Sequence, residues 1–211
     1  MAEPSAPAAR IYLVTPPAFD AGLPDRIAAV LDRFEIACLR LALVADAEDE
    51  VARAADALRP VAHARDVPLV VTDHVVLAGR LGLDGVHLTD GARRVRAARA
   101  ALGRDAIVGA YAHASRHDGL NAAEIGADYV SFGPAGPTGL GDGSVAPLDL
   151  FEWWSEMIEV PVVAEGGITP EVAGSLARAS DFVALGSEIW SSPLGPELAL
   201  AAVVARLDAG G

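Results

Sequence analysis

Two acidic residues of this sequence come directly after short apolar runs, at points where a β-strand is expected to end. Asp73 follows VPLVVT, and Asp90 follows GVHLT. Because carboxylates at neighbouring strand ends can share a Mg²⁺ ion whose other ligands are phosphate oxygens of a substrate, the pair is a candidate metal site. Asp73 can instead cap a helix that begins at His74, which is a frequent use of aspartate. The two roles are compatible.

Two glycine-containing segments near the end of the sequence are suited to hold a phosphate group. AEGGI contains Gly166 and Gly167, and LGSEIW contains Gly186 and Ser187. Glycine lets a ligand approach the backbone closely, and the first turn of a helix presents N–H groups with positive potential. We therefore predict that both segments bind phosphate through backbone amides. The alternative is that Gly166 and Gly167 only form a tight turn.

His113 and Glu165 are the candidates for acid–base chemistry. His113 lies just past an apolar run and is the best placed of the five histidines, although a hydrogen-bonded structural histidine fits this position equally well. Glu165 also ends an apolar run, where an unpaired carboxylate inside a barrel mouth would have a raised pKa. Either side chain is therefore a candidate base.

A third segment, GPAGPTGLGDGS at residues 133–144, contains five glycines and two prolines in twelve residues. A stretch of this composition cannot form a packed element, so we expect a mobile lid or a ligand cradle. The alternative is a connection without a function.

The elements that must position these residues are short apolar runs that alternate with longer helix-compatible segments. Runs rich in Val, Ile and Leu are typical of parallel strands buried on both faces, and their spacing leaves room for a crossover helix. Eight such units predict an α/β fold, a (β/α)8 TIM barrel, whose active site lies at the carboxyl ends of the strands. A doubly wound open sheet is the alternative. The runs begin near Ile11, Ile36, Val67, Gly85, Ala106, Tyr129, Pro161 and Phe182.

Helix signals lie between these runs. Residues 46–65 are rich in helix formers and begin with acidic residues, and Thr169 followed by Pro170 is a typical helix start. Pro193 and Pro196 are expected to open a last helix that ends near Leu207. No shift in composition marks a second domain, so we expect a flexible terminus at residues 1–10 and a single barrel domain at residues 11–211.

The composition excludes several partners and mechanisms. The 211 residues include 16 basic and 29 acidic side chains, and the net charge of −13 argues against nucleic acid or an anionic membrane as a partner. All the basic residues are arginines. The absence of lysine excludes a Schiff-base aldolase, a P-loop NTPase and a pyridoxal phosphate enzyme, since each needs a lysine amine.

Localisation and assembly follow from a few further features. The longest apolar run has eight residues, near residues 198–205, well below the roughly 18 that span a bilayer. Cys38 is the single cysteine, which excludes an internal disulfide and fits a cytoplasmic protein. The adjacent Trp153 and Trp154 indicate core packing or an oligomer contact, so a homodimer is possible.

Taken in order, IYLVT, the long segment from VPLVVTD to DGVHL, GAYAHA, GADYVSFGPAGPT, PVVAEGGIT and LGSEIW resemble the family of thiamine phosphate synthase and TenI-like thiazole tautomerase. The resemblance runs from Ile11 to about Trp190. It implies a synthase that joins a pyrimidine methyl diphosphate to a thiazole phosphate with Mg²⁺ and releases diphosphate.

The resemblance also implies roles for individual residues. Asp73 would bind the metal, and Thr138 would contact the thiazole phosphate. Arg40 would hold the diphosphate and the pyrimidine. The phosphate would lie on the amides of Gly166, Gly167, Gly186 and Ser187.

The sequence departs from the family pattern at its cations. In the family, a run of the kind Q-x-R-E-K ends the second strand, and here only Arg40 is kept, between Cys38 and Ala42. The lysine of the family's lid falls on Gly141. Lost cations and a strongly negative chain disfavour the leaving diphosphate, so we expect synthase turnover to be slow or absent.

Other departures affect the metal and the acid–base groups. The family's second metal aspartate falls near Ala92, where Asp90 is a substitute two residues earlier. The serine of the fifth-strand motif is replaced by Tyr111, its histidine is kept as His113, and the tautomerase's lid histidine falls on Pro134.

Whether the chain is an enzyme therefore stays open at this point. One alternative is an isomerase that acts on a phosphorylated heterocycle with His113 or Glu165 as base. The other is a non-catalytic protein that binds thiazole phosphate.

Overall fold

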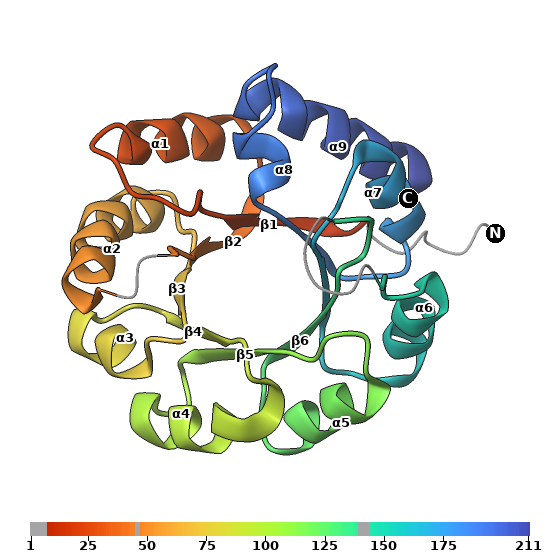
Figure 1. Cartoon of the computed structure of the whole chain (residues 1–211), viewed down its shortest axis with the longest axis horizontal. Helices are drawn as coiled ribbons and strands as arrows, with labels where there is room; N and C mark the ends of the chain where they lie inside the picture. Colours follow the sequence, from red (N-terminus) through yellow and green to blue (C-terminus); the bar gives the residue numbers. More distant parts are fainter. Residues whose placement is uncertain (1–7, 45–46, 139–143) are drawn as a thin grey trace.

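A closed barrel of eight parallel strands forms the centre of the molecule (Figure 1). The computed structural model describes residues 8–44, 47–138 and 144–211. Each strand pairs with its neighbours in sequence, and β8 closes the barrel against β1. The predicted (β/α)8 barrel is confirmed and the open sheet is excluded. The strands are β1 (Arg10–Val14), β2 (Ile36–Leu41), β3 (Leu69–Thr72), β4 (Gly85–Leu88), β5 (Ile107–Tyr111), β6 (Tyr129–Phe132), β7 (Val162–Glu165) and β8 (Phe182–Leu185).

The helices surround the barrel as an outer ring (Figure 1). Their apolar faces pack against the outward-facing strand residues in one large core. No helix within the described residues is long and apolar enough to cross a membrane. The helices are α1 (Leu23–Arg33), α2 (Glu48–His63), α3 (Val75–Leu81), the 3-10 helix η1 (Gly91–Arg94), α4 (Val95–Leu102), α5 (Arg116–Glu124), α6 (Leu148–Met157), α7 (Pro170–Leu176), α8 (Ser187–Trp190) and α9 (Pro196–Gly210).

Two of the helix starts test the sequence signals directly. The side chain of Thr169 accepts a hydrogen bond from the amide of Val172, so the predicted cap of α7 is confirmed. The last helix begins at Pro196 rather than Pro193, because Gly195 adopts a positive φ of 81° just before it. A residue at positive φ interrupts the helical backbone, so Pro193 lies in the preceding turn.

The tryptophans of α6 occupy different environments. Trp154 is fully buried and packs edge to face against Phe132, with ring centroids 5.0 Å apart. Trp153 is only partly buried, and the guanidinium of Arg116 lies 4.7 Å from its ring centroid. The pair therefore contributes one side chain to the core and one to the outer surface of the barrel.

A polar network crosses the interior of the barrel below its carboxyl end. The hydroxyls of Tyr12 and Tyr129 are 2.7 Å apart, and Nδ1 of His87 lies 2.9 Å from the Tyr129 hydroxyl. Gly109 makes room for this network, because a Cβ there would collide with the Tyr129 ring. Burial and the charge of Arg40 hold the pKa of His87 well below its ordinary value. His87 is therefore a neutral structural residue.

Candidate active site

A cavity of about 490 Å³ opens at the carboxyl end of the barrel. Its volume is in the range of small-molecule sites, and it lies where the fold predicts the active site. The predicted site residues Arg40, His113, Thr138, Glu165, Gly166, Gly186 and Ser187 line it. The remaining lining residues are Val14, Tyr111, Ala114, Gly133, Pro134, Ser144, Ala184 and Glu188.

The floor of this cavity carries an ion pair. The guanidinium of Arg40 lies 2.8 Å from the carboxylate of Glu165, and the two side chains are only 12% and 16% exposed. Burial lowers the pKa of Arg40, but the charge of Glu165 raises it further, so the pKa stays above its ordinary value. The expectation that Glu165 is an unpaired carboxylate is therefore wrong, because a permanent cation neutralises it.

Tyr111 and His113 form one wall of the cavity. The Tyr111 hydroxyl donates a hydrogen bond of 2.8 Å to the carbonyl of Gly133, and burial together with the charge of Glu165 raises its pKa to about 12. His113 is exposed, and its ring stands edge to face against the Tyr111 ring at 4.6 Å between centroids. The His113 side chain makes no hydrogen bond with a described residue, so nothing in that part of the chain fixes its tautomer.

The loops after β6 and β7 are joined through their backbones. The amides of Ala135 and Gly136 donate to the carbonyl of Gly166 at 2.9 and 3.0 Å. Gly166 and Gly167 adopt positive φ angles of 81° and 69°, which favour glycine. A Cβ on Gly167 would also collide with the carbonyl of Gly136. The glycines thus allow a tight turn and a close approach of two loops at the edge of the cavity.

Glu188 bridges the two predicted phosphate segments, and sequence reasoning did not single it out. Its Oε1 accepts a hydrogen bond of 2.8 Å from the Gly167 amide, and its Oε2 accepts one of 3.0 Å from the Gly186 amide. The Gly167 and Gly186 amides define what we call the amide cradle. The only sequence signal was an acidic residue inside the second segment, LGSEIW.

Asp73 and Asp90 are linked by Arg94, which lies between their carboxylates. Arg94 donates from Nη2 to the Asp73 carboxylate and from Nε to the Asp90 carboxylate, the latter at 2.7 Å. Thr89 donates to Asp73 from its amide at 3.0 Å and from its hydroxyl. Burial raises the pKa of Asp73, but the bonds from Thr89 and Arg94 lower it further, to below its ordinary value. The Asp73 carboxyl is therefore ionised.

The capping role considered for Asp73 is not the one it has in the structure. The residue before α3 is His74, and no side chain caps that helix. The Asp73 carboxylate turns instead toward Thr89, after β4. This orientation places it beside the next strand end, as the metal hypothesis requires.

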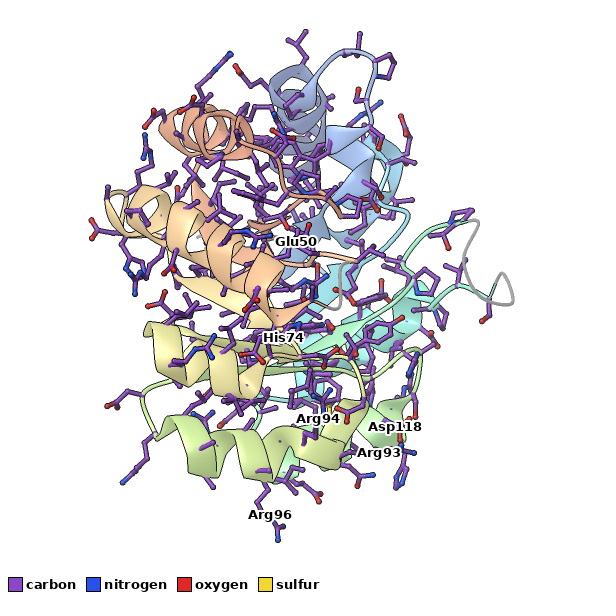
Figure 2. The ribbon with its side chains drawn as sticks, turned by 60° about the vertical axis from the view of Figure 1, so that its left-hand side comes forward. Glu50, His74, Arg93, Arg94, Arg96 and Asp118 are labelled. Carbon is purple, nitrogen blue, oxygen red and sulfur yellow. The ribbon has the colours of Figure 1, made fainter. Side chains whose placement is uncertain are left out.

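A second cavity of about 510 Å³ adjoins the first. Tyr111 and His113 line both cavities, so they form a shared wall. Arg93 lines the second cavity and makes no ion pair with a described residue. Figure 2 shows Arg93 beside Asp118, whereas Arg96 points away from the body of the molecule. The other lining residues are Asp90, Gly91, Ala92, Asp118 and Asn121.

The donor set at Asp73 and Asp90 fits a Mg²⁺ site of the open kind. Such sites use one or two carboxylates and complete their coordination with water and substrate phosphate. Asp90 Oδ1 is buried without a hydrogen-bond partner in the described part of the chain, which leaves an acceptor for a cation. No three or more His, Cys, Asp or Glu side chains among the described residues are placed to hold a metal ion by themselves. A metal here would therefore depend on phosphate oxygens for its remaining ligands.

Part of the predicted lid lies outside the described residues. Gly141, the position of the family's lid lysine, lies outside the described residues, which omit 139–143. Residues 133–138 before the gap are held to β7 through the bonds to Gly166.

The fold and this cavity define a class: a small (β/α)8-barrel protein with a ligand-sized polar site at the carboxyl end of the strands. Over residues 11–189 the sequence matches the family described as thiamine monophosphate synthase. The chain belongs to this family of thiamine biosynthesis, as the resemblance predicted.

Similar proteins carry the same description. The thiamine-phosphate synthase of Rhodospirillum centenum is 45% identical over 195 residues, which cover 91% of this chain and 94% of that protein. The thiamine-phosphate synthase of Erythrobacter litoralis is 39% identical, with 90% and 92% covered. The solved structure of thiamine phosphate pyrophosphorylase from Pyrococcus furiosus has the same fold, with a TM-score of 0.80 at 23% identity and 95% and 96% covered.

Proposed function

We propose that this chain is a thiamine-phosphate synthase that holds its leaving diphosphate with arginines rather than lysines. The reaction breaks the bond between the pyrimidine methylene carbon and the diphosphate oxygen, and the diphosphate leaves with the electron pair. The lone pair of the thiazole nitrogen then forms the new C–N bond. The observation that carries the proposal is the pair of adjoining cavities that share Tyr111 and His113, because such a reaction must hold two substrates side by side.

The first cavity is suited to the thiazole phosphate. The amide cradle and the Ser187 hydroxyl can donate to a phosphate group, and Thr138 lines the same cavity. Val14 and Ala184 offer apolar surface to the heterocycle. Bound in this way, the ring nitrogen would face the wall formed by Tyr111 and His113.

The second cavity is suited to the diphosphate. Arg93 is a cation without an ion-pair partner among the described residues, and each charged hydrogen bond to a leaving group contributes about 1.5–3 kcal/mol. Asp73 and Asp90 would hold a Mg²⁺ ion, which supplies charge neutralisation on the leaving group. Arg94, which donates to both carboxylates, would then turn toward the phosphate oxygens.

The electrostatics favour slow turnover. Arg40 is already paired with Glu165, so the Glu165 carboxylate offsets most of the attraction that Arg40 would exert on a diphosphate. Position 42 is alanine, and its side chain cannot donate a hydrogen bond. Loss of two cationic hydrogen bonds corresponds to roughly two to four decades of rate if nothing replaces them. Arg93 and Arg94 would recover part of this loss.

The isomerase alternative is not favoured. Glu165 is held in an ion pair by Arg40, so it is not the free carboxylate that this alternative needs as its base. His113 is exposed, so it is poorly placed to act in a water-excluded site. A binding protein without catalysis is distinguished from a synthase by product formation alone.

The proposal also covers the setting of the protein. A phosphorylated small molecule is the ligand, and neither nucleic acid nor a membrane is a partner of a chain with a charge of −13. The single cysteine is buried and free, which is typical of a cytoplasmic protein. Residues 11–211 act as one domain.

Simultaneous binding tests the two-cavity arrangement. Calorimetric titration with the thiazole phosphate is carried out with and without saturating diphosphate and Mg²⁺. The proposal predicts that both ligands bind together and that diphosphate changes the thiazole phosphate affinity by less than about threefold. Mutually exclusive binding would contradict it, because both phosphate groups would then use the same cavity.

A further inference from the structure

The carboxylate of Glu188 lies where the phosphate of a ligand is expected. Its two oxygens accept hydrogen bonds from one amide of each loop, Gly167 at 2.8 Å and Gly186 at 3.0 Å. A carboxylate and a phosphate are both anions that bind converging backbone N–H groups. The chain therefore fills its own anion site with a side chain from the short helix that follows β8.

We propose that Glu188 is an internal competitor that keeps free phosphate and diphosphate out of the amide cradle and leaves it to a phosphate ester. The proposal rests on the function given above, in which the cradle holds the thiazole phosphate. It adds a residue that sets the affinity of this site.

The competition follows from the number of donors. Each cradle N–H already donates to Glu188, so a phosphate can take both bonds only when the carboxylate leaves. A phosphate placed beside the remaining carboxylate would also meet a like charge at close range. A side chain tethered two residues from Gly186 competes at a high effective concentration, on the order of millimolar or more.

The geometry allows the carboxylate to leave without disturbing the backbone. Glu188 is partly exposed and lines the cavity, so its side chain has space to turn outward. The helix itself is held by other bonds: the amide of Ile189 donates to the carbonyl of Gly186 at 3.0 Å, and the Trp190 indole donates to the carbonyl of Val14 at 2.6 Å. Displacement is therefore a side-chain rotation.

Competition lowers the affinity of every phosphate ligand by the same factor, so the ratio of two affinities is unchanged and the effect is on which ligands occupy the cradle at a given concentration. Inorganic phosphate makes only the cradle contacts, so a further loss of affinity leaves it mostly unbound. An ester also buries its heterocycle against the apolar lining of the cavity, at roughly 25 cal/mol per Å², and still binds. The same device would keep the released diphosphate from blocking the cradle.

Anion titration of three proteins tests the inference: the wild type, Glu188→Ala and Glu152→Gln. Glu152 is exposed on α6 and outside the cavity, so the control removes one negative charge elsewhere. The probe is inorganic phosphate, and its affinity is read from the amide NMR signals of Gly167 and Gly186. Glu188→Ala is expected to bind phosphate about tenfold more tightly, a difference of 1.4 kcal/mol. Glu152→Gln is expected to match the wild type.

Equal or weaker phosphate binding by Glu188→Ala would overturn the inference, because Glu188 would then hold the loops in place rather than compete. Glu188→Gln is the second variant if the alanine protein does not fold, and it is expected to show a smaller gain, since a neutral amide is a weaker acceptor. A gain for phosphate without any binding of thiazole phosphate would contradict the proposed function and leave the competition intact.

Discussion

Arg40 and Glu165 form an ion pair of 2.8 Å on the floor of the cavity, with the Arg40 guanidinium 5.6 Å from the centroid of the Tyr12 ring. The pair brings no net charge to the site, although it supplies the only cation among the described lining residues of the first cavity. Positive charge for a diphosphate would therefore come from the neighbouring cavity, which Arg93 lines.

Removing one partner of this pair should be costly. Glu165→Gln leaves the Arg40 charge largely buried without a counter-ion, and we expect the free energy of unfolding to fall by about 2–3 kcal/mol, somewhat less than for a fully buried pair. Denaturant unfolding measures the change. The double variant Arg40→Met, Glu165→Leu is the control, and it should be more stable than Glu165→Gln. A double variant that is less stable would show that the pair itself, rather than the stranded charge, stabilises the barrel.

The metal hypothesis predicts a stabilisation that depends on Asp73. Mg²⁺ with diphosphate should raise the Tm, because a ligand that binds only the native state stabilises it by mass action. Asp73→Asn should abolish this increase, and Arg94→Gln should reduce it, since the guanidinium that the metal displaces no longer donates to the diphosphate. Arg96→Gln, which removes a charge that points into solvent (Figure 2), is the control for Arg94. An undiminished Mg²⁺ effect in Asp73→Asn would rule out this residue as a ligand.

Arg93 should matter to the diphosphate substrate. Arg93→Gln removes one charged hydrogen bond, so kcat/KM for the pyrimidine methyl diphosphate should fall by about tenfold or more. Steady-state kinetics with the thiazole phosphate held at saturation measures this effect. Arg96→Gln serves again as the matched control and should retain the wild-type value. Equal losses in both variants would indicate a general effect of charge instead of a contact.

His87 should make the protein less stable in mild acid. Its pKa is lowered in the folded protein, so the native state stays neutral while the unfolded chain takes up a proton below about pH 6.5. The free energy of unfolding should therefore fall by up to about 1.4 kcal/mol per pH unit as the pH drops from 6.5 toward the depressed value. Denaturant unfolding of wild type and His87→Gln at several pH values measures the difference. A variant with the same slope as the wild type would assign the pH dependence to other groups.

The barrel was predictable because its signals are local. The strands begin within two residues of the expected positions, since a buried parallel strand must be continuously apolar and a crossover fixes the spacing. Thr169 and Pro170 marked a helix start through backbone chemistry that needs no tertiary context. Of the two prolines expected to open the last helix, only Pro196 does so, because positive φ at Gly195 excludes Pro193, and the sequence only permits that conformation.

The site was predictable in location but not in pairing. Strand ends placed Arg40, Glu165 and the glycine loops around one cavity. The pairing of charged side chains depends on the directions in which they point across the barrel. The sequence therefore did not predict the contact of Arg40 with Glu165 or the link between Asp73 and Asp90 through Arg94. Glu188 was missed for the same reason, because its partner Gly167 belongs to a different loop.

Product formation tests the central claim most directly. The purified protein is incubated with the pyrimidine methyl diphosphate, the thiazole phosphate and Mg²⁺, and ³¹P NMR follows both products over time. We predict that thiamine phosphate and free diphosphate form in equal amounts, slowly, and faster in an Ala42→Lys variant that restores a cation at the end of β2. Release of diphosphate without thiamine phosphate, or no reaction while both substrates are bound, would contradict the assignment as a synthase.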